Sequence, residues 1–213
     1  MSRNQIIIGL VSLVALFVFL FVAYTLTNKP ESIVFPEANK VLSSDHAKWA
    51  KDKKNILVEY SDLQCPACKS FHEIIKSQVE TDKSITDKVT FVYRHFPLYQ
   101  THQFAEKAAW AAEAAGKQNK FFEYADKLFA NQKSWSAGED IDKKFESYAS
   151  ELKLDLEKFK KDMNSRDVKN KVQADAASGD KFQVNATPTF YLNGKKLDSI
   201  RSFDEFTQLL KSL

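Results

Sequence analysis

Residues 6–26 form a run of 21 residues that contains no charged side chain. A helix of this length rises ~1.5 Å per residue and spans about 30 Å, which is the thickness of the hydrocarbon core of a bilayer. A cleavable signal peptide has a shorter apolar region, of about 7 to 15 residues, and a small-residue cleavage site. Residues 22–27 instead read VAYTLT, and no cysteine near them could carry a lipid. The run therefore predicts a retained transmembrane signal-anchor helix.

This anchor divides the chain into a short tail, residues 1–5, and a large C-terminal part. The flanking positive charges, Arg3 with the α-amino group on one side and Lys29 on the other, give only a small orientation bias. We place the tail in the cytoplasm and the large part outside the membrane, because a very short tail favours signal-anchor topology and a cysteine pair is most useful where disulfides persist. Residues 27–38, with two prolines and no helical periodicity, are predicted to be a spacer.

The charge of the C-terminal part argues against nucleic acid as a partner. Once Arg3 and Lys29 are set aside, 29 Lys and Arg remain against 28 Asp and Glu, a net charge of about +1. Nucleic-acid-binding domains carry a clustered basic face, whereas the lysines at 158–161 are balanced by Glu157 and Asp162. A part of ~180 residues is long enough to bury one core and to hold an inserted subdomain.

The first half of this part has the pattern strand, helix, strand. Residues 55–61 are dense in strand-forming side chains and predict a central strand. A helix is predicted to begin at Pro66, with one apolar face formed by Phe71, Ile74, Ile75 and Val79. Residues 88–95 alternate as a second strand.

The rest of the chain combines a helical block with a second strand region. The block covers about residues 101–179, with helices predicted at 104–115, 121–129, 141–152, 156–163 and 168–177. Strands at 189–192 and 196–200, joined by an Asn193-Gly194 turn, and a helix at 203–213 follow. The predicted fold class is α/β: one central mixed sheet formed by a βαβ half and a ββα half, with an inserted helical subdomain.

The only two cysteines stand in the sequence Cys65-Pro66-Ala67-Cys68, between the first strand and the helix. A bridge around two residues constrains the unfolded chain very little, which argues against a purely structural disulfide. Pro66 suits the first helical position, so Cys65 lies at the N-cap, where unpaired N–H groups and the helix dipole lower a thiol pKa. Cys68, one turn further on, lacks that stabilisation. We predict that Cys65 is the nucleophile of disulfide exchange and that Cys68 is the buried resolving cysteine.

Two further features bear on the chemistry of this pair. Glu59 lies in the predicted central strand, where burial would raise its pKa, and we predict that it exchanges a proton with Cys68 through water; the alternative is a solvated carboxylate at the strand end. Cys65, Cys68 and His72 have a spacing that suits zinc, but zinc needs a fourth ligand and the chain has no second cysteine pair. We predict no metal, no cofactor and no catalytic histidine.

Three segments resemble a known family: residues 59–68 (EYSDLQCPAC), residues 93–98 (YRHFPL) with His102, and residues 184–190 (VNATPTF). Together they are similar to the DsbA-like thiol:disulfide oxidoreductases, which have the thioredoxin fold and include membrane-anchored members in bacterial envelopes. The resemblance covers about residues 40–213, so we predict a thioredoxin domain at 39–213. It implies that Pro188 is cis, that Thr187 lies opposite Cys65, and that the backbone before this proline pairs with an extended client segment. We expect Thr187, Pro188, Pro66 and Ala67 to bind the client.

The resemblance also implies an activity and partners. It implies a protein-disulfide oxidoreductase on the extracytoplasmic face of the cell membrane, with reduced exported proteins as clients and a quinone-linked, DsbB-like membrane protein as the reoxidising partner. Between its cysteines the chain has Pro66-Ala67, whereas the best-known strong oxidants of the family have Pro-His, and the missing imidazole favours a less oxidising pair. We favour a dithiol oxidase. The alternatives are an envelope disulfide reductase or isomerase and a non-catalytic client-binding module.

Overall fold

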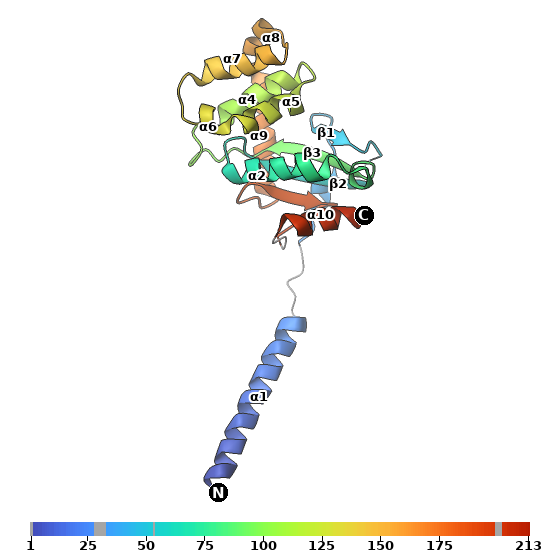
Figure 1. The fold of residues 1–213 in the computed structure, drawn as a ribbon, viewed down its shortest axis with the longest axis vertical. Helices are drawn as coiled ribbons and strands as arrows, with labels where there is room; N and C mark the ends of the chain where they lie inside the picture. Colours follow the sequence, from blue (N-terminus) through green and yellow to red (C-terminus); the bar gives the residue numbers. More distant parts are fainter. Residues whose placement is uncertain (1, 28–32, 53, 199–201) are drawn as a thin grey trace. The chain divides into compact units, whose positions relative to one another are not determined.

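The computed structural model describes residues 2–27, 33–52, 54–198 and 202–213 (Figure 1). The chain forms two compact units, Met1–Ile33 and Val34–Leu213. In the first unit the structure describes one long helix, α1 (Arg3–Thr27), whose segment Arg3–Thr25 is long and apolar enough to cross a membrane by length and composition. The span predicted at 6–26 lies within this helix. Residues 28–32 of the predicted spacer, Lys29 among them, lie outside the described residues.

The second unit is built around a mixed five-stranded sheet with the strand order β1-β3-β2-β4-β5. The strands are β1 (His46–Trp49), β2 (Asn55–Ser61), β3 (Val89–His95), β4 (Thr189–Leu192) and β5 (Lys195–Lys196). The neighbours β2 and β3 are parallel, and their register places Glu59 opposite Tyr93. The remaining pairs are antiparallel. The predicted α/β fold with a central mixed sheet is therefore confirmed.

As the sequence predicts, one helical crossover connects the first two predicted strands, and a longer helical block follows the second. The crossover from β2 to the parallel β3 consists of α2 (Pro66–Ile74), the π-helical turn η2 (Ile75–Val79) and α3 (Lys83–Thr86). A helical block follows β3 and gathers in the upper part of the view (Figure 1). Its helices are α4 (Ala105–Gly116), α5 (Phe121–Ala130), α6 (Gln132–Trp135), α7 (Ile141–Glu151), α8 (Leu156–Met163) and α9 (Arg166–Lys181). The last helix, α10 (Phe203–Lys211), follows the β4–β5 hairpin.

Both faces of the sheet are covered, and each face has its own apolar core. The larger core joins Leu57 and Phe91 of the sheet to Cys68 of α2 and to side chains of α10 and the helical block. The smaller core joins Val58 and Tyr60 to Phe182, which follows α9. All seven residues of β3 are consequently buried. The residues between the alternating apolar positions, Thr90, Val92 and Arg94, are buried as well, because β3 pairs with a strand on each side and has an apolar core on each face.

The start of the domain also needs correction. The spacer was predicted to reach residue 38, but Phe35 packs its ring against Phe182 and Tyr191 at centroid distances of 5.6 and 6.0 Å. The backbone N–H of Phe35 donates to the carbonyl oxygen of Gly194 at 2.7 Å, and Ala38 in the 3₁₀ turn η1 (Pro36–Asn39) is fully buried. These apolar contacts draw residues 34–38 into the domain.

Two strands differ from the prediction. The edge strand β1 was not predicted, because a run of only four residues, HAKW, is too short for a clear strand pattern, and the strand is held by its pairing with β3. The strand predicted at 196–200 is the short β5, and residues 199 and 200 lie outside the described residues. The turn before it is as predicted: Asn193 and Gly194 have φ of 52° and 79°, which suits a tight hairpin.

A buried ion pair joins the segment before β1 to the centre of the sheet. Arg94 on β3 is 2% exposed, and its Nε and Nη2 donate to the two carboxylate oxygens of Asp45 at 3.1 and 2.9 Å. The same guanidinium donates to the hydroxyl of Tyr60 at 3.0 Å and to the carbonyl oxygen of Lys40 at 2.8 Å. The contacts satisfy a charge that would otherwise be costly to bury.

We therefore predict that Asp45→Ala lowers the free energy of unfolding by about 3 to 5 kcal/mol, because it leaves the Arg94 charge buried without a counterion. The measurement is urea unfolding of the full chain in detergent, followed by tryptophan fluorescence. The control is Asp142→Ala, which breaks a surface ion pair with Lys107 and should have a much smaller effect. Equal losses in the two variants would contradict the prediction.

Candidate active site

The site begins where β2 ends and α2 starts. Cys65 is the N-cap residue of α2, with extended backbone angles (φ −73°, ψ 124°), and Pro66 is the first helical residue. A proline is favoured there because its missing N–H would have no partner in the helix. Cys65 is 7% exposed and Cys68 is fully buried, whereas Pro66 and Ala67 are exposed. The predicted placement of both cysteines is therefore found, and both thiols are free.

The surroundings of the two sulfur atoms separate their pKa values. The pKa of Cys65 is lowered from 9.0 to about 5, chiefly because the Cys68 thiol hydrogen bonds to its thiolate, and the backbone N–H groups of Ala67 and Cys68 add to the effect. Burial raises the pKa of Cys68 well above 9.0, and the neighbouring Cys65 and the charge of Glu59 raise it further. At neutral pH the reduced pair thus holds one thiolate, on Cys65, and one thiol, on Cys68. Only the thiolate is a competent nucleophile.

Glu59 lies beneath Cys68 in the buried layer, as the sequence predicts. It is 3% exposed, and burial raises its pKa from 4.5 to about 7. By strand alternation and register, Ser61 and Tyr93 face the same layer. The hydroxyl oxygens of Ser61 and Tyr93 are buried without a hydrogen bond partner among the described residues. The proton-transfer role of Glu59 stays a prediction, but its burial and raised pKa suit a group that is protonated near neutral pH.

The loop before β4 lies across from Cys65. The Thr187–Pro188 peptide bond is cis, and Cys65 Sγ lies 3.5 Å from the carbonyl oxygen of Thr187, which the protonated thiol reaches as a donor. The position of Thr187 opposite Cys65 and the cis proline agree with what the motifs imply. Client binding by Thr187, Pro188, Pro66 and Ala67 stays a prediction.

Two cavities flank this loop and share Asn185. One, of about 260 Å³, has a floor of Phe71, Phe190 and Phe206 beside Pro188. The other, of about 410 Å³, is lined by residues 96–101 together with Ala176 and Asp180. Tyr99 at the second cavity is 52% exposed. Apolar surface is thus available on both sides of the cis proline.

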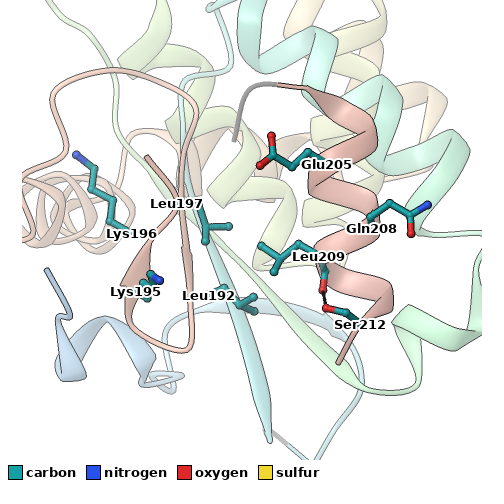
Figure 2. A pocket seen from close by; sticks show the side chains of 8 residues that line it. All are labelled: Leu192, Lys195, Lys196, Leu197, Glu205, Gln208, Leu209 and Ser212. Carbon is teal, nitrogen blue, oxygen red and sulfur yellow. Dashed lines mark hydrogen bonds between the residues drawn. The ribbon is translucent and has the colours of Figure 1, made fainter. Parts of the chain in front are cut away.

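A further pocket, of about 450 Å³, is not part of this site. It lies between the β4–β5 hairpin and α10, where Leu192, Leu197 and Leu209 face the gap (Figure 2). None of its lining residues is a cysteine or one of the predicted site residues. Lys195 and Glu205 are exposed, whereas Lys196 and Leu197 also line the cavity beside Pro188.

The histidines have structural partners. His72 pairs with Asp126 at 3.0 Å and stacks on Phe129, and His95 contacts Glu113 at 3.1 Å. His102 contacts the carboxylate of Asp62 at 2.8 Å. Among the described residues, no group of three or more His, Cys, Asp or Glu side chains is placed to hold a metal ion.

Sequence reasoning missed two residues that hold the cysteine loop. Asp62, which is 1% exposed, donates its backbone N–H to Cys68 Sγ at 3.4 Å. Gln132 of α6 donates its side-chain amide to the carbonyl oxygens of Leu63 and Cys65, both at 2.9 Å. The signal for Asp62 was its position three residues before Cys65, within the resemblance motif. Gln132 lies 67 residues further along the chain, and no local pattern indicates it.

Comparison with known proteins places this fold and site in a family. Residues 34–212 match the family model described as Thioredoxin. The chain belongs to the thioredoxin family. Within this family, the crystal structure of oxidised BdbD from Bacillus subtilis superposes with a TM-score of 0.68 at 21% identity, covering 85% of this chain and 97% of that one. The structure of Wolbachia pipientis alpha-DsbA1 gives a TM-score of 0.67 at 23% identity, covering 83% and 95%.

Two proteins are similar to this chain in amino-acid sequence. A protein named probable disulfide bond formation protein D, from Bacillus cereus, is 29% identical over 200 residues, which are 91% of this chain and 90% of that protein. The Na(+)/H(+) antiporter NhaA 1 of Mycobacterium sp. (strain KMS) is 36% identical over 156 residues, which are 71% of this thioredoxin-family chain and 24% of the antiporter. The chain thus spans about a quarter of the antiporter. The DsbA-like resemblance predicted from the motifs is confirmed for the family and the fold.

The Cys65 thiolate generates one prediction. Alkylation of the reduced full chain by iodoacetamide should rise with pH and reach half of its plateau near pH 5, because only the thiolate reacts. Cys68→Ala removes the hydrogen bond to this thiolate and should move the midpoint upward. Cys65→Ala, which keeps the less acidic thiol, is the control. A midpoint that is the same with and without Cys68 would contradict the assignment.

Glu59 generates a second prediction. A carboxyl whose pKa rises from 4.5 to about 7 on folding binds more protons in the folded than in the unfolded state between these values, so its own contribution to the free energy of unfolding falls as the pH rises through this window, opposite in sign to that of Cys65. The fall amounts to about 3 kcal/mol. Glu59→Gln should abolish most of it, as measured by urea unfolding of the reduced chain from pH 4 to 8. Glu73→Gln, at an exposed position of α2, should keep the wild-type profile; the same profile in Glu59→Gln would refute the prediction.

Proposed function

We propose that this protein is a membrane-anchored thiol-disulfide oxidase that donates its Cys65–Cys68 disulfide to exported proteins. The observation that carries the proposal is the separation of the two thiol pKa values. Because Cys65 is a stable thiolate when reduced, it is a good leaving group, and the reduced form of the pair is favoured over the disulfide. A pair whose reduced form is stabilised in this way passes its disulfide on to other thiols.

The reaction proceeds through two exchanges on Cys65. A client thiolate attacks Cys65 Sγ, so that the Cys65–Cys68 bond breaks, a client–Cys65 bond forms, and the electron pair leaves with Cys68. A second client thiolate then attacks the client sulfur of this mixed disulfide, and Cys65 leaves as a thiolate. The client gains one disulfide, and the protein gains the two electrons as a reduced pair. Glu59 would supply the proton that Cys68 takes up.

The client would lie along the loop of the cis proline. Thr187 and Pro188 bring this loop to Cys65, and the flanking cavities provide apolar side chains, such as Phe71 and Phe96, interspersed with polar ones. Such a surface suits unfolded segments of varied sequence, which expose their apolar side chains. Pro66 and Ala67 are exposed at the same edge and would contact the client as it reaches Cys65.

The proposed location is the extracytoplasmic face of a bacterial cell membrane. Helix α1 supports an anchor by its length and composition. The antiporter relatives support it as well, because they are named as membrane transporters and contain a segment similar to this domain. The reoxidising partner would be a quinone-linked, DsbB-like membrane protein, a proposal that rests on family analogy.

A reductase or isomerase is the second candidate, and the dipeptide Pro66-Ala67 favours it. Neither residue carries an imidazole that could add to the stabilisation of the Cys65 thiolate. The pKa of about 5 for Cys65 is nevertheless reached without one. A third candidate, a non-catalytic binding module, predicts that Cys65→Ser preserves the cellular role.

The test is oxidation of reduced ribonuclease A by catalytic amounts of the full chain in detergent, with glutathione disulfide as the terminal oxidant. We expect faster disulfide formation than with glutathione disulfide alone, loss of this activity in Cys65→Ala, and a trapped client adduct in Cys68→Ala. The reduction potential should lie nearer about −120 mV than about −270 mV. Reduction of insulin without oxidation of ribonuclease, with a potential near the lower value, would favour the reductase.

A further inference from the structure

Asp62, in the loop between β2 and α2, contacts both cysteines through its backbone. Its N–H donates to Cys68 Sγ at 3.4 Å, and its carbonyl oxygen accepts the N–H of Cys65 at 3.0 Å. A backbone amide can reach a sulfur atom only if the loop that carries it is held in place. The side chain of the same residue provides such a hold.

The Asp62 carboxylate is fully buried and accepts three hydrogen bonds. Its Oδ1 accepts the backbone N–H of Gln64 at 2.7 Å, which closes the loop on itself. Its Oδ2 accepts the backbone N–H of Leu98 and the ring Nδ1 of His102, both at 2.8 Å. The cysteine loop is thereby joined to the segment between β3 and α4, and the carboxylate charge is satisfied.

The chemistry of exchange places a negative charge on Cys68 for a short time. When a thiolate attacks Cys65, the Cys65–Cys68 bond breaks and the electron pair leaves with Cys68. The reverse step, in which Cys68 displaces a client from Cys65, passes through the same charge distribution. Burial makes this charge costly, as the strongly raised pKa of Cys68 indicates. A hydrogen bond donor on Cys68 Sγ would lower the barrier in both directions.

We propose that Asp62 is a positioning residue for disulfide exchange, whose buried carboxylate, held by Gln64, Leu98 and His102, fixes its own backbone N–H on Cys68 Sγ. The inference rests on the proposed function only in requiring that the pair exchanges disulfides, in either direction. The stable end states contain Cys68 as a disulfide or as a neutral thiol. Loss of the donor should therefore slow both directions by a similar factor and leave the reduction potential nearly unchanged.

The test uses Asp62→Asn in the full chain in detergent. The variant keeps the size of the side chain and one acceptor oxygen, but its amide NH₂ group cannot accept the hydrogen bonds that Oδ2 accepts. In one reaction the oxidised protein is mixed with glutathione, and in the other the reduced protein is mixed with glutathione disulfide. Samples are quenched with acid, and the protein species are identified by their masses in mass spectrometry. We expect both the attack on the internal disulfide and the release of glutathione by Cys68 to slow about tenfold, the effect of one hydrogen bond to a charged atom. The Cys65–glutathione adduct should accumulate when the reduced protein reacts with glutathione disulfide, because Cys65 still attacks at the normal rate while resolution by Cys68 is slowed.

The matched control is Asp175→Asn. Asp175 is a buried carboxylate of α9, 4% exposed, that accepts the backbone N–H of His95 at 3.1 Å and pairs with Lys171. The structure gives it no hydrogen bond to either cysteine. Asp175→Asn should exchange glutathione at the wild-type rate.

Variants of His102, which is partly exposed, decide the matter if Asp62→Asn fails to fold. His102→Ala removes one of the three hydrogen bonds and should slow both directions by a smaller factor, whereas His102→Asn supplies a side-chain N–H and should recover most of the rate. A folded Asp62→Asn that exchanges at the wild-type rate overturns the proposal. Equal slowing in Asp175→Asn also overturns it, and so does a change in only one of the two rates with a matching shift of the reduction potential. If Asp62→Asn does not fold, a wild-type exchange rate in His102→Ala overturns the proposal. Failure of the ribonuclease assay alone would overturn only the oxidase assignment.

Discussion

The unequal solvation of two sulfur atoms one helical turn apart is the constraint on which this site depends. Cys65 stands at the start of α2, where the first N–H groups of the helix and the Cys68 thiol face its thiolate. Cys68 lies on the buried face of α2, in the larger core and near Glu59, where a negative charge on its sulfur is costly. The same helix therefore carries one cysteine with a lowered pKa and one with a raised pKa. This difference in pKa depends on two features: the N-terminus of α2 at Cys65 and the apolar core around Cys68.

Polar contacts from distant parts of the chain keep this arrangement fixed. The helical block reaches the cysteine loop through Gln132, whose amide holds two of its carbonyl oxygens, and through Phe104, whose backbone N–H donates to Gln64 at 2.8 Å. On the edge of the sheet, Glu113 of α4 accepts hydrogen bonds from His46 and His95, which outweigh its burial and lower its pKa. The inserted block is thus joined to the thioredoxin part by satisfied polar groups and by apolar packing together. Buried polar networks of this kind fix one geometry only when each member has a partner.

Much of the fold follows from local sequence patterns. The bounds of β2, β4 and α8 agree with the predicted residues, because the two strands are short runs of strand-forming residues and α8 is an amphipathic helix that Asp155 caps. The edge strand β1 was not predicted, and the alternation in β3 did not show that both of its faces are buried, because both features depend on neighbouring elements. The prediction also failed for residues 34–38, which were assigned to the spacer at 27–38 but pack on the domain through Phe35. In the site, the cysteines and Glu59 were indicated by residue type and position, and the cis proline loop was implied by the family resemblance. Asp62 and Gln132 were not, because their roles come from contacts over long separations in sequence.

The sequence by itself determined the apolar helix, the cysteine pair at a helix start and the alternation of strands and helices, because charge, hydrophobic period and capping are local properties. Only the tertiary structure decided how the pair is tuned. The Cys68 thiol that hydrogen bonds to the Cys65 thiolate, the contact of Cys65 with Thr187 and the amide of Asp62 on Cys68 Sγ arise where β2, the cis proline loop and the segment after β3 meet. These pieces are up to 122 residues apart along the chain, as in the contact between Cys65 and Thr187. Solvation and electrostatic stabilisation act through space, so the reactivity of the two sulfurs was fixed by folding.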